Sequence, residues 1–202
     1  RANGWSGAST DPDPDRHGGL TENGRRAVAI ANELGMVIDV SHASDQTVRD
    51  VAEISEDPFV ASHSCAAALV DMPRNLSDEM LALIASKGGV VGVNFHVGFL
   101  SADPPGSVKR KAVVDHVMHM VGVMGADHVA LGSDFDGAKP PMGLKHAGQM
   151  QALARDLLDR GLTQEEVDGV MYGNALRIFA EVTGGGNAPA GPLSFLSWPA
   201  GS

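Results

Sequence analysis

Short apolar runs that end in a histidine or an aspartate recur along this chain and limit the folds open to it. Three of them are Met36–His42, Phe59–His63 and Val129–Asp134. A short apolar run between helical patterns is typical of a buried parallel strand. Because the carboxyl ends of parallel strands meet at one edge of a sheet, we predict that the residues ending these runs face one site.

Helical patterns separate the runs. Thr21, Ser44 and Ser77 are predicted N-caps, and Thr163 with Glu166 is a predicted capping box. A further strand is expected over residues 90–95, a long helix over 113–124, and a last helix from 163 to about 182 with a break near Gly173. The order of one helix, four βα units and an extra helix predicts an α/β fold with a parallel sheet. On these grounds the chain is either half of a (β/α)8 barrel or a small open sheet.

Composition narrows the functional classes. The 202 residues carry a formal charge of −10 and contain no basic stripe, which disfavours nucleic-acid binding. The single cysteine, Cys65, cannot form an internal disulfide, so a cytoplasmic location is expected, and no run approaches the roughly 20 apolar residues of a membrane segment. Residues 1–182 read as one domain and 183–202 as a Gly/Pro-rich mobile tail, while the absence of Met at position 1 predicts that the chain begins inside a longer protein.

His42 and His63 are the candidate metal ligands. They lie 21 positions apart at the ends of consecutive predicted strands, and neighbouring parallel strands are about 4.8 Å apart. Two imidazoles so placed can reach one metal ion at about 2.0–2.1 Å. The alternative is that each histidine only satisfies a hydrogen bond in its loop.

The remaining candidates lie on the same predicted face. Asp134 and Asp136, in Gly-Ser-Asp-Phe-Asp-Gly, can bind a cation, cap a helix or act as a base beside a metal. Arg74 suits a carboxylate, or else forms a surface ion pair, and His96 follows the strand at 90–95. By contrast, His116 and His119 are expected to be solvated on a helix, His128 to be structural, and Cys65 to serve packing.

Taken together, several motifs resemble those of the membrane (renal-type) dipeptidases, the M19 peptidases of the amidohydrolase superfamily. The resemblance covers about residues 1–182 and rests on Gly19-Leu20-Thr21, Gly35–His42, Ser62-His63-Ser64, Arg74–Asp78, Val93-Asn94-Phe95, Gly132–Gly137 and Gly173–Arg177. It implies a (β/α)8 barrel with two zinc ions that cleaves dipeptides. It further implies that His42 and His63 bind the second zinc, Arg74 binds the substrate carboxylate and Asp134 shuttles protons, with lesser roles for Asp136, His96 and Asn75. A homodimer is a further expectation for the assembly.

Other motifs of that family are absent. The His-x-Asp of its first strand, its zinc-bridging glutamate and a substrate-binding histidine have no counterpart here. We therefore expect the chain to be the C-terminal half of a zinc-dependent dipeptidase and to be inactive alone. Two alternatives stay open: an amidohydrolase acting on another amide, lactone or ester, and a non-catalytic fragment or binding module.

Overall fold

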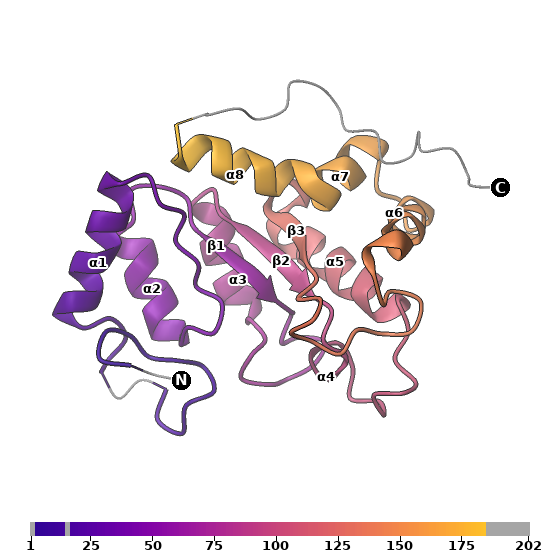
Figure 1. Cartoon of the computed structure of the whole chain (residues 1–202), viewed down its shortest axis with the longest axis horizontal. Coiled ribbons are helices and arrows are strands. Elements are labelled where there is room, and N and C mark those ends of the chain that lie inside the picture. The colour runs from indigo at the N-terminus through magenta and orange to yellow at the C-terminus, as the bar shows by residue number, and fades with distance from the viewer. Residues whose placement is uncertain (1–2, 15–16, 185–202) are drawn as a thin grey trace.

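The computed structural model describes residues 3–14 and 17–184 (Figure 1). Its elements in chain order are α1 (Glu22–Glu33), α2 (Asp45–Ile54), β1 (Val60–Ser64), α3 (Asp78–Ser86), β2 (Val90–Asn94), α4 (Val97–Leu100), α5 (Lys111–Met124), the 3-10 turn η1 (Ala126–His128), β3 (Val129–Gly132), the 3-10 turn η2 (Ala147–Gln149), α6 (Met150–Asp159), α7 (Gln164–Asp168), the π-helical turn η3 (Gly169–Gly173) and α8 (Asn174–Val182). The predicted tail falls mostly outside the described residues.

Three parallel strands form the sheet, in the order β1-β2-β3. The α/β architecture is therefore as predicted, but the strand predicted at 36–40 is wrong in extent. That segment lies beside β1 and makes only one bridge, between Asp39 and Val60. Its ladder stops because the Asp39 side chain, rather than a backbone carbonyl, accepts the N–H of Ser62.

The two faces of the sheet pack against different helices. The main core joins residues such as Val91 and Val129 to the buried sides of α2, α3 and α5. Val90 and Ala130, which point the other way, join a smaller cluster with α8. Figure 1 shows α8 crossing the sheet on the side away from α3 and α5.

A β-bulge interrupts β1 just before its end. Ala61 pairs with Val91 and Ser64 with Val93, so β1 has one residue more than β2 over this stretch. The carbonyl oxygen of Ser62 then projects over Gly92 and Gly132, where a Cβ atom on either glycine would overlap it. The two glycines are what allow the bulge, and the bulge contains His63.

The predicted helix starts are confirmed. Thr21, Ser44 and Ser77 each accept a backbone N–H from the first turn, and Thr163 and Glu166 form a capping box. The expected break near Gly173 is the π-helical turn η3. Within residues 3–14 and 17–184, no helix has the length and apolar character needed to cross a bilayer.

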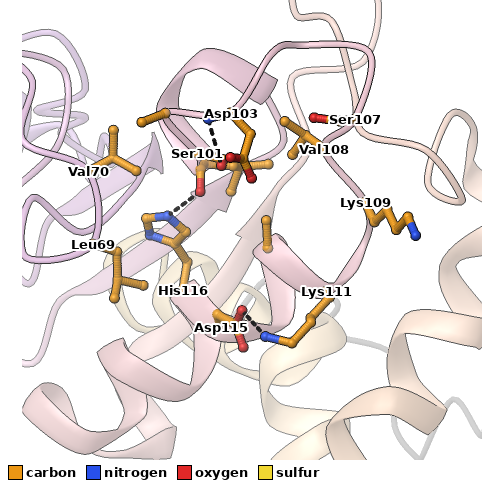
Figure 2. A pocket seen from close by; sticks show the side chains of 13 residues that line it. Leu69, Val70, Ser101, Asp103, Ser107, Val108, Lys109, Lys111, Asp115 and His116 are labelled. Carbon is orange, nitrogen blue, oxygen red and sulfur yellow. Dashed lines mark hydrogen bonds and ion pairs between the residues drawn. The ribbon is translucent and has the colours of Figure 1, made fainter.

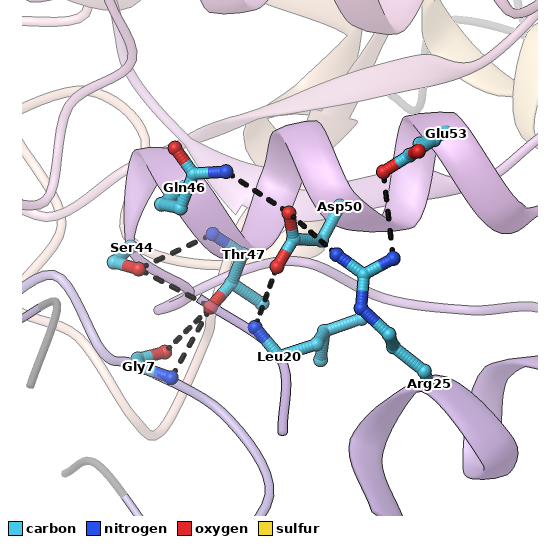
Figure 3. A network of polar contacts seen from close by, with 8 residues as sticks. All are labelled: Gly7, Leu20, Arg25, Ser44, Gln46, Thr47, Asp50 and Glu53. Atoms are coloured by element: carbon cyan, nitrogen blue, oxygen red, sulfur yellow. Dashed lines mark hydrogen bonds and ion pairs between the residues drawn. The ribbon is translucent and has the colours of Figure 1, made fainter. Parts of the chain in front are cut away.

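The N-terminal loop is fastened to α2 by polar contacts around the buried carboxylate of Asp50 (Figure 3). Asp50 accepts the backbone N–H of Leu20 at 2.7 Å and pairs with Arg25 at 3.2 Å. Thr47 Oγ1 accepts the N–H of Gly7 at 3.2 Å. The loop that these contacts hold also bonds to the backbone of His42, because the N–H of Ser9 donates to the His42 carbonyl.

Candidate metal centre

His42 and His63 converge. Their Nε2 atoms are 3.0 Å apart, and their ring centroids are 5.0 Å apart at an interplanar angle of 63°. Two nitrogens that each lie about 2.1 Å from one tetrahedral ion are about 3.4 Å apart. The convergence expected from the strand ends is therefore found, and it approaches the geometry of a shared ion.

The backbone at His42 is held in the left-handed region, with φ 71°. This conformation turns the chain sharply after the 36–40 segment and directs the ring toward β1. The N–H of Ser9 donates to the carbonyl of His42 at 2.9 Å, so the N-terminal loop helps to hold the turn. Partial desolvation lowers the pKa of His42, with further lowering from the charges of Arg74 and His63, which favours the neutral, metal-binding imidazole.

Asp39 and Ser62 also belong to the site, and the sequence analysis missed them. Asp39 Oδ1 accepts the backbone N–H groups of Ser41 at 2.9 Å and Ser62 at 3.0 Å. Ser62 Oγ lies 2.5 Å from Asp39 Oδ2 and 2.8 Å from Nδ1 of His63. Burial acts to raise the pKa of the Asp39 carboxyl, but the hydrogen bonds from Ser62 and Ser41 outweigh burial and lower the pKa. The signal in the sequence was a lone aspartate inside an apolar run.

Arg74 is buried beside His63 and is not in a surface ion pair. Its side chain donates from Nη2 to the carbonyl of His63 at 3.0 Å and lies 5.5 Å from the centroid of the Phe99 ring. Burial lowers its pKa, which the charges of Cys65, Asp134 and Asp39 partly counteract. Among the described residues its buried Nε has no hydrogen-bond partner and no carboxylate lies within 4.0 Å.

Asn75 clamps the loop that carries Arg74. Its Nδ2 donates to the carbonyls of Val70 at 2.8 Å and Phe99 at 3.0 Å. The residue as a whole is buried, with 7% of its surface exposed. In this arrangement Asn75 fixes the position of Phe99 and the Arg74 loop relative to each other.

Asp134 lies where β3 ends, next to Asn94 at the end of β2. Asn94 Nδ2 donates to Asp134 Oδ2 at 3.3 Å, and Asn94 Oδ1 accepts the N–H of His96 at 2.6 Å. Nδ1 of His96 in turn accepts the N–H of Lys139 at 3.2 Å. The fully buried Asn94 thus ties the predicted residues Asp134 and His96 together, a role that sequence reasoning did not assign to it.

A tight turn after β3 sets the backbone of both aspartates. Asp134 has φ 52° and Asp136 has φ 70°, a conformation that aspartate adopts more readily than most residues. The carbonyl of Asp134 accepts the N–H of Ala138 at 2.7 Å and of Gly137 at 3.1 Å. The strained turn holds Asp134 at the carboxyl edge of the sheet.

The prediction that His116 is solvated is wrong. His116 is fully buried, Nδ1 accepts the N–H of Ala66 at 3.1 Å, and Nε2 faces the carbonyl of Leu100 at 3.3 Å. It lies against a separate cavity of 410 Å³ (Figure 2). The helical period of α5 did not reveal this because the loop at 100–108 covers that face of the helix.

The expectations for Cys65, His128 and His119 agree more closely with the structure. Cys65 is fully buried, and burial raises the pKa of its thiol to about 12, as suits a packing residue. His128 Nδ1 lies 2.8 Å from the carbonyl of Gly89, away from the site. His119, expected to be solvated, is partly exposed and lies 2.8 Å from Asp78.

The donor set fits part of a metal site. Zinc sites in proteins take three or four ligands, commonly including imidazole nitrogens. Over residues 3–14 and 17–184, no group of three or more His, Cys, Asp or Glu side chains is close enough to hold an ion. The chain therefore brings two nitrogen ligands together and leaves the rest of a coordination shell open.

His42, His63 and Asp134 lie at the carboxyl edge of a parallel α/β sheet, the edge at which catalytic residues gather in folds of this kind. Comparison with known families matches residues 1–188 to the family described as membrane dipeptidase (peptidase family M19). The chain belongs to this family, as the sequence motifs indicated.

Individual proteins similar to this chain are also named as dipeptidases or metallo peptidases. Human Dipeptidase 3 is 38% identical over 165 residues, which are 81% of this chain and 33% of that protein. A metallo peptidase from Rhodobacter sphaeroides, solved with a phosphinate mimic of the dipeptide L-Ala-D-Ala, is 36% identical with a TM-score of 0.77, over 81% of this chain and 47% of that one. The probable dipeptidase PvdM from Pseudomonas aeruginosa is 28% identical with a TM-score of 0.84, over 91% and 61%. The chain thus spans about a third to three fifths of the length of these relatives.

Proposed function

We propose that this chain forms the C-terminal part of a zinc-dependent dipeptidase and contributes one pair of metal ligands. The observation that carries the proposal is the 3.0 Å approach of the Nε2 atoms of His42 and His63. Family membership supports it, since the M19 family is described as membrane dipeptidases. In the complete enzyme the sheet would continue into a (β/α)8 barrel.

His42 and His63 would hold the metal through their Nε2 atoms. Bound zinc polarises a carbonyl and lowers the pKa of water toward about 7. The described residues offer only two ligands. The remaining ligands would come from the part of the complete enzyme that corresponds to the unmatched length of the relatives. The isolated chain is accordingly expected to bind zinc weakly and to be inactive.

Asp134 would move protons. Its carboxylate is oriented by the amide of Asn94 at 3.3 Å, and it lies at the sheet edge that carries the histidines. In this position it can accept a proton from the attacking water and deliver it to the leaving amine. Asp136 and His96 shape the surrounding loop.

Arg74 would bind the C-terminal carboxylate of the dipeptide. Its guanidinium is buried beside His63 and has no carboxylate partner in the described part of the chain. A buried cation is costly unless it is paired, so an anionic substrate group would complete the site. This preference for an acid favours dipeptides over substrates without a carboxylate.

The metal role is tested by zinc titration of the chain followed by calorimetry. Wild type should bind one zinc ion, and His42→Ala and His63→Ala should each abolish binding. His96→Ala is the matched control, because His96 lies at the same edge but its Nδ1 already accepts a backbone N–H. If zinc binds equally to all four proteins, the proposed metal pair is wrong.

A further inference from the structure

The second ring nitrogen of His63 ends a chain of hydrogen bonds. Asp39 Oδ2, Ser62 Oγ and His63 Nδ1 follow one another at 2.5 and 2.8 Å. The other nitrogen, Nε2, faces His42. This series of hydrogen bonds therefore contacts His63 on the ring nitrogen that faces away from His42.

The direction of these bonds follows from what each group can donate. An ionised carboxylate only accepts hydrogen bonds, and Asp39 Oδ1 is already occupied by two backbone N–H groups. The single hydroxyl proton of Ser62 therefore points to Asp39 Oδ2. Ser62 Oγ can then only accept from Nδ1, which places the proton of the His63 ring on Nδ1.

Ser41 leaves this direction unchanged. Its Oγ accepts the backbone N–H of His63 at 3.0 Å and lies 3.3 Å from Ser62 Oγ. The Ser41 side chain also hydrogen-bonds Asp39, and because an ionised carboxylate only accepts, Ser41 can donate its hydroxyl proton to Asp39 or to Ser62. Neither arrangement of Ser41 takes the hydroxyl proton of Ser62, which remains with Asp39 Oδ2 at 2.5 Å.

The bulge in β1 makes the contact possible. In a regular strand, consecutive side chains point to opposite faces. Because β1 carries an extra residue between Ala61 and Ser64, the side chains of Ser62 and His63 instead lie 2.8 Å apart. A side chain aimed in this way is a common purpose of bulges next to active sites.

We propose that Asp39 and Ser62 are positioning residues that keep the ring proton of His63 on Nδ1 and so leave Nε2 free to bind metal. Metal-binding histidines generally donate their other ring N–H to a partner that fixes ring and tautomer. Here the partner is a serine backed by a carboxylate. The inference rests on the metal role proposed for His63, but the tautomer can be measured without metal.

The first test is ¹⁵N NMR of the histidine side chains in the metal-free chain. Wild type should show His63 protonated on Nδ1. Asp39→Asn should reverse the direction of these hydrogen bonds. The new amide donates to Ser62 Oγ, and Ser62 then donates to Nδ1 of His63, which moves the ring proton to Nε2. Ser62→Thr retains the hydroxyl and should keep the wild-type tautomer.

The second test is zinc affinity. Removing the partner of a metal-binding histidine typically costs about 10–100-fold in affinity, and we expect this loss in Ser62→Ala and Asp39→Asn. Ser64→Ala is the matched control, since it makes the same change on the other side of His63 at a hydroxyl with no hydrogen-bond partner among the described residues. It should bind zinc as wild type does.

The outcomes separate the two hypotheses. An Nε2-protonated His63 in wild type, or an unchanged tautomer in Asp39→Asn, overturns the inference even if zinc binds. The same holds if Ser62→Ala and Ser64→Ala lose affinity equally. A His63 ring that is protonated on Nδ1 in wild type and on Nε2 in Asp39→Asn supports the inference. If zinc affinity is then unchanged in His42→Ala and His63→Ala, only the proposed metal site is refuted.

Discussion

The burial of Arg74 sets what this residue can bind. It is 6% exposed and, within the described part of the chain, makes one hydrogen bond, to the carbonyl of His63. A guanidinium has five N–H donors, so most of its capacity is available to an anion. Its contact with His63 also ties any substrate carboxylate closely to the proposed metal pair.

In the complete enzyme, Arg74→Ala should lower kcat/KM for free dipeptides far more than for their C-terminal amides. A hydrogen bond to a charged group contributes about 1.5–3 kcal/mol, or roughly ten- to a hundredfold in rate. The measurement is steady-state kinetics on paired substrates, with Arg49→Ala as a control because Arg49 pairs with Glu79 on the surface. Equal losses for acid and amide would remove Arg74 from carboxylate binding.

Asp134→Asn in the complete enzyme should abolish turnover and leave the zinc content unchanged. Asparagine retains the shape and the contact with Asn94 but cannot accept a proton at neutral pH. General acid–base catalysis contributes about 10²–10⁴-fold, so kcat should fall by at least that order. Asp136→Asn is the matched control and should have a milder effect. Loss of zinc in parallel with activity would instead make Asp134 a ligand.

His116 should make the protein less stable in acid. Burial is the main cause that lowers its pKa from 6.5 to about 4, with the contact to Leu100 opposing. Between these values the unfolded chain binds a proton that the folded chain does not. The free energy of unfolding should therefore keep its full value above pH 6.5 and fall by roughly 3 kcal/mol toward pH 4. Urea unfolding across this range should show the decline in wild type and a flatter profile in His116→Gln. Parallel profiles would show that another group is responsible.

The bulge of β1 depends on two glycines in other strands. Ser62 projects its carbonyl over Gly92 and Gly132, within the bulge that contains His63. The relative placement of His42 and His63 therefore depends in part on Gly92 and Gly132, which lie 29 and 69 positions after His63 in the sequence.

Gly132→Ala should destabilise the chain by about 1–3 kcal/mol, the usual cost of overpacking. The reason is that the new methyl group overlaps the carbonyl oxygen of Ser62. Thermal unfolding measures the effect. Gly122→Ala is the control, because Gly122 lies in α5 with open space around it and alanine should stabilise a helix by up to about 1 kcal/mol. If both variants are equally stable, the bulge does not need Gly132.

Local patterns predicted the helices well and the strands partly. Capping residues such as Ser77 act on their own first turn, so sequence reveals them. The pairing of His42 with His63 was predictable because both follow apolar runs of consecutive βα units. The hydrogen bonds of Asp39 and the contact of Asn94 with Asp134 were not, because they depend on register and on a bulge that arises from distant glycines.

The molecule leaves apolar surface uncovered. Leu34, Met36 and Phe179 are 68%, 56% and 57% exposed. Over residues 3–14 and 17–184, β3 pairs with β2 alone, so its other edge has no strand partner. Unpaired edges and apolar patches favour association.

The isolated chain should therefore self-associate. Sedimentation velocity at increasing protein concentration should show a rising mean mass. The double variant Leu34→Lys with Phe179→Lys should shift the distribution toward monomer if the apolar surface drives the contact. A concentration-independent monomer in wild type would contradict this expectation.

The central claim is that His42 and His63 bind one metal ion together. X-ray absorption spectroscopy of the chain loaded with less than one equivalent of zinc tests it most directly. We predict imidazole scattering from two histidines at about 2.0–2.1 Å, falling to one histidine in His42→Ala and in His63→Ala. A zinc environment without two imidazoles, or one that is unchanged in both variants, would contradict the account.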